Sequence, residues 1–292
     1  MRKLDTVVTA AQDGRRVRDI LKERFDFAES LLSHLKFLPG SVLKNGRNTR
    51  LADRAAEGDR LTVLIPGGGK AAVDFPLPVV YEDEDLLILN KPAGMTVHGA
   101  AGGRETVESL WKEYHGDRPF HPVNRLDRGT GGLMVAAKSG FVHNALRKML
   151  HTADFRREYL AVVSGIVQPE CGVIDLPLDR AEGKSFVSES GKAALTHYEA
   201  VAAGEQCTLL RLRLETGRTH QIRAHCAHLG HPLLGDTLYG GESCILTRPA
   251  LHAAKIVMRQ PVTGERIVAE APLPEDMRLL FREKNIKLGS MK

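Results

Sequence analysis

The sequence contains few cysteines and few aromatic residues. Of its 292 residues, four are cysteines and one is a tryptophan. No two cysteines lie at the close spacing of metal ligands, which counts against a cysteine-bound zinc site. We therefore expect small core residues or free thiols in a reducing compartment at Cys171, Cys207, Cys226 and Cys244.

Long hydrophobic runs are also absent. No stretch of 18 or more apolar residues occurs, so we expect no membrane span. The first five residues, Met1–Asp5, do not begin the long apolar core that a secretory signal requires. These absences favour a cytoplasmic protein.

The overall composition is that of a folded protein with a basic surface. Hydrophobic residues make up 42% of the chain, which is enough for a buried core and argues against disorder. The length favours two domains. The formal net charge of +5 suits an acidic partner such as nucleic acid, although many other proteins share this property.

We expect a short lead at residues 1–12 and a small basic unit at residues 13–66, in which lysine and arginine outnumber aspartate and glutamate. Two sets of hydrophobic residues recur there at helical spacing: Val17, Ile20 and Leu21, then Leu31, Leu32 and Leu35. A turn at Pro39-Gly40 precedes a predicted strand and tight hairpin turn at Val42–Gly46, and a turn and last strand follow at Glu57–Ile65.

A glycine-rich segment separates this unit from the rest of the chain. Gly67, Gly68 and Gly69 are consecutive, and two prolines follow at positions 76 and 78. No Gly-Lys-Ser/Thr ending follows the glycines, so this is not a phosphate-binding loop. We interpret residues 67–78 as a linker.

The remaining chain mixes strand and helix patterns. Leu86–Asn90 predicts a short buried strand, and leucines alternating with arginines between Leu210 and Leu214 predict a half-buried strand. Two helices are expected. The first spans Phe141–Leu150, with Phe141, Ala145 and Met149 on one stripe; the second is capped by Thr219, buries Ile222, Cys226 and Leu229, and ends at Gly230. Such a mixture indicates an α+β domain.

The segment His121–Val135 holds the most informative acidic residue. Asp127 lies between Arg125 and Arg128 in a glycine-rich turn, directly before the apolar run Leu133–Ala137. A carboxylate beside fixed positive charge suits chemistry on an anionic substrate. An ion pair that only holds the turn explains this segment equally well.

Five sequence blocks in order resemble the RluA-type family of RNA pseudouridine synthases. The resemblance covers about residues 79–280, and its blocks are Asn90–His98, Arg125–Gly131, Arg157–Gly165, Thr216–His225 with its continuation to Asp236, and Leu251–Ala253. Two positions depart from the family pattern: Gly131 stands where serine is usual, which would loosen the turn, and Asn124 stands where histidine is common.

The resemblance implies a catalytic domain at residues 79–285 with a central mixed, largely antiparallel β-sheet flanked by helices, followed by a tail at 286–292. It implies that Asp127 is the essential carboxylate, that Tyr159 stacks on the target uracil, and that Arg223 holds Asp127 ionised. Arg125 would fill the space left by a flipped-out uridine or hold a phosphate, and Lys91 and His98 would line the RNA path.

The small basic unit resembles an S-four-like RNA-binding module, which often precedes this catalytic domain. Its candidate phosphate contacts are Lys36, Lys44, Arg47, Arg50 and Arg54. A solvated surface of mixed charge is the alternative. The resemblance further implies that the substrate is RNA, with large-subunit ribosomal RNA preferred over transfer RNA, and that the protein is a monomer.

Pseudouridine formation breaks the bond between ribose and uracil, turns the base, and rejoins it through carbon. A carboxylate beside the sugar acts there as nucleophile, base or electrostatic partner, and the sequence leaves these roles open. No second acid is obviously paired with Asp127, which counts against an ordinary two-carboxylate hydrolase. The isomerisation has no redox step and no external group donor, so no cofactor or metal is expected.

Two other interpretations were weighed. One is zinc binding by histidines that lie close in sequence, but they lack the spacing of zinc proteases: His220, His225, His228 and His231, with His252 later. The other is a non-catalytic RNA-binding or ribosome-assembly protein, which the basic unit alone would support. The joint presence of Asp127, Tyr159 and Arg223 favours the enzyme.

Overall fold

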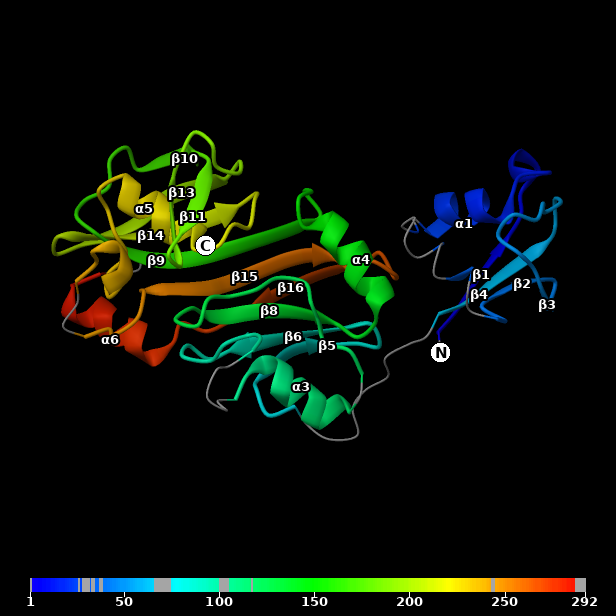
Figure 1. Cartoon of the computed structure of the whole chain (residues 1–292), viewed down its shortest axis with the longest axis horizontal. Helices are drawn as coiled ribbons and strands as arrows, with labels where there is room; N and C mark the ends of the chain where they lie inside the picture. Colours follow the sequence, from blue (N-terminus) through cyan, green and yellow to red (C-terminus); the bar gives the residue numbers. More distant parts are fainter. Residues whose placement is uncertain are drawn as a thin grey trace.

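The structure is a computed structural model, and it describes residues 2–25, 27, 32, 35–36, 39–65, 75–99, 105–116, 118–242 and 245–286. Statements below concern these residues. The predicted positions of Leu31 and Cys244, most of the expected linker and residues 287–292 of the expected tail lie outside them. Figure 1 shows a small N-terminal unit beside a larger domain built on one long sheet.

The N-terminal unit is a four-stranded antiparallel sheet with helix α1 (Val17–Phe25) beside it. In sheet order its strands are β1 (Arg2–Val7), β4 (Arg60–Ile65), β2 (Val42–Lys44) and β3 (Arg47–Asn48), and a short 3-10 helix, η1 (Ala10–Gln12), follows β1. Strand β1 pairs with β4 along its whole length, so residues 2–7 of the predicted lead at residues 1–12 take part in this sheet. This strand could not be recognised from sequence, because a segment of mixed charge with few apolar residues does not stand out as an edge strand.

Local features of this unit follow from its sequence. Ile20 and Leu21 of α1 are buried, as the helical spacing predicts. Asn45 and Gly46 both adopt positive φ between β2 and β3, the conformation that a two-residue hairpin turn requires. The predicted hairpin is thus confirmed.

The larger domain contains a ten-stranded mixed sheet that follows the order β10-β13-β14-β9-β15-β8-β6-β5, with β16 paired to β15 and β7 paired to β8. All pairs are antiparallel except β8 with β15. Its strands are β5 (Val79–Glu82), β6 (Leu86–Lys91), β7 (His121–Pro122), β8 (Gly131–Ala137), β9 (Phe155–Ser164), β10 (Cys171–Asp175), β13 (Leu195–Gly204), β14 (Cys207–Leu214), β15 (Leu251–Arg259) and β16 (Arg266–Glu270). The expected α+β class with a mixed, largely antiparallel sheet is confirmed.

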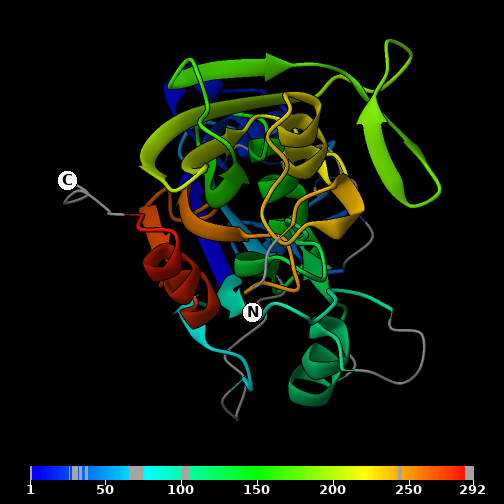
Figure 2. The same ribbon diagram turned by 90° about the vertical axis from the view of Figure 1, so that its left-hand side faces the viewer.

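Helices cover both faces of the sheet (Figure 1). They are α3 (Val107–His115), α4 (Gly140–Met149), α5 (Gln221–His228) and α6 (Glu275–Glu283), with a second 3-10 helix, η2 (Thr237–Tyr239). Strand β6 is buried on both sides because Trp111 of α3 belongs to the core with Leu87 and Leu89, whereas Leu146 of α4 belongs to the core with Leu86 and Ile88. The hairpin of β11 (Leu178–Ala181) and β12 (Lys184–Val187) extends from this body (Figure 2).

The two predicted helices exist, but their contacts differ from the expectation. In α4 the deeply buried side chains are Val142 and Leu146, whereas Phe141 is half-buried and its ring meets that of Phe27 in the N-terminal unit at 5.6 Å. Hydrophobic spacing could not predict which stripe packs on the sheet, because both stripes are apolar.

Helix α5 begins at Gln221, so its N-cap residue is His220 rather than the predicted Thr219. His220 is the N-cap residue with a φ of 52°, and its side chain makes no capping hydrogen bond. Leu229 is 43% exposed, so it does not join Ile222 and Cys226 in the core. Gly230, with positive φ directly after the helix, ends it as predicted.

The prediction is confirmed for the three cysteines that the structure describes: Cys207 and Cys226 are buried free thiols, and Cys171 is an exposed free thiol. In the part of the chain that the structure describes, no helix has both the length and the apolar character needed to cross a membrane.

Candidate active site around Asp127

Asp127 lies in the short loop that joins β7 to β8. Asn124 closes this loop at its base: its Oδ1 accepts from the Val135 amide at 2.8 Å, and its Nδ2 donates to the Leu133 carbonyl at 3.3 Å. Inside the loop, the Thr130 amide donates to the Asp127 carbonyl at 3.0 Å. Asn124, a departure from the family pattern, therefore fixes the loop in which the acid lies.

Gly131 is the first residue of β8 and pairs with His252 of β15. A Cβ atom placed there would lie 3.3 Å from both the Lys91 carbonyl and the Ala93 amide nitrogen. Pairing with β15 holds this end of the turn.

Arg248 clamps the loop from outside. Its Nη1 donates to the Gly129 carbonyl at 3.3 Å, while Nε and Nη2 bind both carboxylate oxygens of Asp276 on α6, each at 2.7 Å. Burial tends to raise the pKa of Asp276, but the hydrogen bonds and charge of Arg248 outweigh it and lower that pKa. This clamp could not be predicted from sequence, because nothing in the spacing links Arg248 to Gly129, 119 positions earlier.

Arg223 projects from the first turn of α5 toward Asp127. Its Nη1 lies 3.5 Å from Asp127 Oδ2, at the limit of a hydrogen bond. Its stronger partner is Asp236: Nε contacts Oδ2 at 2.6 Å and Nη2 contacts Oδ1 at 2.8 Å. Burial opposes ionisation, yet the bonds to Asp236 and the charges of Asp236 and Asp127 raise the pKa of Arg223. A permanent cation therefore faces Asp127.

Asp236 is the residue that holds Arg223 in place, and it was not among the predicted site residues. It is 1% exposed and forks with Arg223, so it fixes the guanidinium plane. The sequence signal for this residue was that Asp236 ends one of the blocks that resemble the family. A buried acid at that position requires a cation as its partner.

Tyr159 of β9 completes the predicted trio. Its side chain is buried, and burial raises the pKa of its hydroxyl, with the charge of Asp127 adding to this effect. Asp127, Tyr159 and Arg223 line one small cavity of about 60 Å³, and Arg125, which is exposed, borders it. The structure thus brings together four of the predicted site residues.

His220 also lines this cavity, although the sequence analysis considered it only as a zinc ligand. Its Nε2 lies 3.8 Å from Asp127 Oδ2, and its Nδ1 lies 3.3 Å from the Tyr239 hydroxyl. Its position directly before the helix that carries Arg223 was the signal available in the sequence.

Lys91 does not lie among the residues that line the cavity, and its predicted contact with RNA stays a prediction. The residue is 1% exposed, and its Nζ donates to the carbonyls of Pro92 and Met95, both at 2.8 Å. Burial lowers the pKa of Lys91 to about 8, against the opposing charge of Asp127. Its amine points into the turn of its own segment, which sequence spacing does not reveal.

His98 lies at the surface, outside the residues that line the cavity. Its Nδ1 is 3.3 Å from Glu108 Oε2 on α3, and its ring contacts that of Phe120. The structure does not bring it to Asp127.

Two further histidines of the set considered for zinc, His225 and His231, contact the fold around them. His225 contacts Thr196 Oγ1 through Nδ1 and the Leu176 carbonyl through Nε2, each at 2.9 Å, and His231 contacts the Ser164 carbonyl at 2.8 Å. Within the described ranges, no three histidine, cysteine or acidic side chains cluster as metal ligands do.

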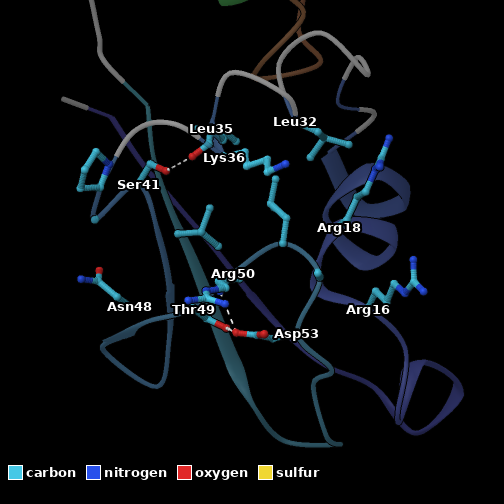
Figure 3. Close-up of a pocket in the computed structure, with 15 residues that line it drawn as sticks. Arg16, Arg18, Leu32, Leu35, Lys36, Ser41, Asn48, Thr49, Arg50 and Asp53 are labelled. Atoms are coloured by element: carbon cyan, nitrogen blue, oxygen red, sulfur yellow. Dashed lines mark hydrogen bonds between the residues drawn. The ribbon is translucent and has the colours of Figure 1, made fainter.

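The N-terminal unit has a wider groove of about 820 Å³ (Figure 3). Of the five predicted phosphate contacts, Lys36 and Arg50 line it. Arg16 and Arg18, at the start of α1, also line it and were missed, because their helical positions alone did not distinguish them from a solvated surface. The groove is therefore bordered by basic side chains from two parts of the unit.

The other three predicted contacts lie outside the groove lining. Lys44 donates to the Arg54 carbonyl at 3.0 Å and lies 3.8 Å from Asp59, and Arg54 donates to the Gly14 carbonyl at 2.6 Å. Arg47 is exposed on β3. Lys44 and Arg54 thus hold the unit together.

Known proteins similar to this chain match it over most of its length. The profile of the family described as RNA pseudouridylate synthase matches residues 85–228. Ribosomal large subunit pseudouridine synthase D of Vibrio cholerae is 39% identical over 94% of this chain and 93% of its own length. The uncharacterized RNA pseudouridine synthase YhcT of Bacillus subtilis is 35% identical over 96% of this chain and 97% of its own length.

Solved structures agree on the fold. Human RNA pseudouridylate synthase domain containing 4 matches with a TM-score of 0.61 at 22% identity, over 73% of this chain and 95% of that chain. Human RNA pseudouridylate synthase domain containing 1 matches with a TM-score of 0.57 at 22% identity, over 74% of this chain and 98% of that chain. At 22% identity, both similarities show the fold alone.

Proposed function

This chain belongs to the RNA pseudouridylate synthase family and is therefore a pseudouridine synthase, and from this premise we propose that it isomerises specific uridines of large-subunit ribosomal RNA. The target is supported by relatives named for the large ribosomal subunit, from Vibrio cholerae and Escherichia coli O157:H7, that match over nearly their whole length. Transfer RNA is the alternative substrate.

Asp127 is the proposed essential carboxylate. The observation that carries this role is its place in a cavity beside Arg223, 3.5 Å away, and Tyr159. Both the covalent role and the deprotonating role at the ribose require an ionised acid. A guanidinium held by Asp236 supplies a fixed positive charge beside Asp127.

The target uridine must leave its helix or loop to reach this cavity. Arg125 is exposed at the cavity border, so its side chain is free to fill the vacated space or bind a phosphate. Tyr159 offers an aromatic surface for the uracil. The cavity of about 60 Å³ is small, so binding requires the surrounding side chains to move apart.

The N-terminal unit is the proposed S-four-like RNA-binding appendage, which holds RNA backbone at the groove of Lys36 and Arg50. With β1 included, this unit covers residues 2–65, and the catalytic domain covers residues 79–285. The enzyme works on RNA in the cytoplasm as a monomer, without cofactor or metal.

The direct test is an assay of the purified protein on large-subunit ribosomal RNA and on transfer RNA, both transcribed without modification. Pseudouridine at a discrete ribosomal site, absent with Asp127→Asn, is the expected result. Glu283→Gln, an exposed acid on α6, is the matched control and should retain activity. Product only in transfer RNA would overturn the target, and full activity of Asp127→Asn would overturn the proposed role of the acid.

A further inference from the structure

Arg157, the third residue of β9, is a buried cation that the site described above does not use. The residue is 6% exposed, and its Nε and Nη2 atoms are buried without a hydrogen-bond partner. Among the described residues, no acidic side chain forms an ion pair with it. Because an unpaired buried charge is costly, a guanidinium in this state indicates a binding site for an anion.

The position of Arg157 places this charge at the wall of the Asp127 cavity. Side chains alternate along a strand, so Arg157 lies on the same face of β9 as Tyr159. The register between β9 and β14 brings Leu214, the last residue of β14, beside Arg157. Tyr159 and Leu214 both line the cavity. The guanidinium therefore lies behind two residues of the cavity lining.

A glycine gives access to this guanidinium from the surface. Gly217 is exposed in the turn after β14, and a Cβ atom placed there would lie 3.4 Å from Arg157 Nη1. The acid of this turn, Glu215, is engaged elsewhere, because its Oε1 lies 2.6 Å from His197 Nε2. An anion can thus approach Arg157 past a residue without a side chain, and Glu215 does not compete for the charge.

The chemistry of the free donors indicates which anion fits. The Nε and Nη atoms of a guanidinium form a planar fork that binds two oxygens of a phosphate or carboxylate. Arg125 and Arg218, both exposed, line the same cavity and add positive charge to its border. An RNA strand brings a phosphate to this place together with the ribose that Asp127 must reach. Of the two oxyanions, the phosphodiester is therefore the ligand.

We propose that Arg157 binds the phosphate adjoining the target uridine, reached past Gly217, and so positions the ribose against Asp127. This inference rests on the proposed function. Entry of the uridine moves the side chains of the small cavity apart, which uncovers Nε and Nη2, and the bound phosphate then neutralises the buried charge. In the free protein the guanidinium stays unpaired, so Arg157 favours RNA binding at the expense of the stability of the free protein.

Arg157→Met tests both parts of this statement, because it removes the charge and keeps an apolar side chain. We expect KM for RNA to rise about 10-fold with kcat changed less than about twofold. The Tm of the free protein should equal or exceed that of wild type, since an unpaired buried charge is removed. Arg157→Lys keeps the charge and should retain part of the affinity. Arg156→Met, exposed on the opposite face of the same strand, is the matched control and should leave KM unchanged.

The contact itself is tested with RNA that carries a neutral methylphosphonate on the 5′ or the 3′ side of the target uridine. At one of the two positions it should raise KM for wild type and cause no further rise in Arg157→Met. Independent losses at both positions would overturn the inference, and so would a lower Tm of Arg157→Met with KM unchanged, which marks a structural arginine. Both outcomes leave the proposed function intact, whereas absence of pseudouridine with wild type would overturn the two together.

Discussion

At the scale of single residues, Asp127 depends on charged side chains that arrive from several parts of the chain. Arg223 comes from α5, Asp236 from the loop before η2, and Lys91 from the end of β6. Each of these three side chains is buried and bound by specific partners. Removing one partner therefore leaves a buried charge without compensation.

Arg223→Met should be strongly destabilising because it leaves the Asp236 carboxylate buried and unpaired. We expect a loss of about 3–5 kcal/mol in the free energy of unfolding, measured by chemical denaturation. Adding Asp236→Asn should recover part of this loss. Equal stability of the single and double variants would contradict the pairing.

Lys91 should impose a pH dependence on stability. Its pKa is about 8 in the folded protein and 10.5 ordinarily, so between these values the unfolded chain binds more protons and stability rises with pH. Lys91→Met lacks this contribution. Between pH 7.5 and pH 10.5, the unfolding free energy of wild type should therefore rise relative to that of Lys91→Met by up to about 3 kcal/mol. Parallel curves for the two proteins would show that the amine is not desolvated as described.

Much of the residue-scale site could be predicted from sequence. Asp127, Tyr159 and Arg223 line one cavity, as the motifs imply, since each motif occupies its expected strand, loop or helix. The burial of Lys91 and the contact of His220 with Asp127 could not be predicted, because both depend on which way a side chain turns within a segment.

At the scale of elements, the parallel pairing of β8 with β15 holds the loop of Asp127 in place. Gly132 makes this pairing possible: it adopts a φ of 112°, and a Cβ there would lie 2.3 Å from the Ala253 carbonyl oxygen. Sequence showed the glycine-rich turn but not this approach, which joins strands more than a hundred residues apart.

Gly132→Ala should therefore cost about 3 kcal/mol or more in unfolding free energy. Gly264→Ala, in the turn between β15 and β16, is the matched control because it has a similar positive φ and open space around it. We expect it to cost about 1–2 kcal/mol by the backbone effect alone. Thermal and chemical denaturation of both variants measure the difference, and equal losses would rule out the close contact.

At the scale of the whole molecule, a basic N-terminal unit contacts α4 of the larger domain through Phe27 and Phe141. Composition and helical spacing predicted the α1 core and the β2–β3 hairpin of this unit. The strand β1 was missed because its pairing with β4 spans more than fifty residues. The groove combines side chains from separate segments, so only part of its lining could be predicted.

If the groove holds RNA backbone, the double variant Lys36→Gln and Arg50→Gln should weaken RNA binding and leave turnover of bound RNA unchanged. The slope of log affinity against log salt should fall by about 1.5, as expected for two lost phosphate contacts. Arg282→Gln, exposed on α6 at the far end of the molecule in Figure 1, is the control. An unchanged slope in the double variant would remove the groove from the RNA path.

The central claim is that this chain makes pseudouridine at specific sites of large-subunit ribosomal RNA, with Asp127 as the essential carboxylate. Its most direct test is pseudouridine mapping of total RNA from cells that lack the gene, complemented with wild type or with Asp127→Asn. We predict that discrete ribosomal sites disappear and return only with wild type. Persistence of every site in the deletion strain, with no redundant enzyme present, would contradict the account.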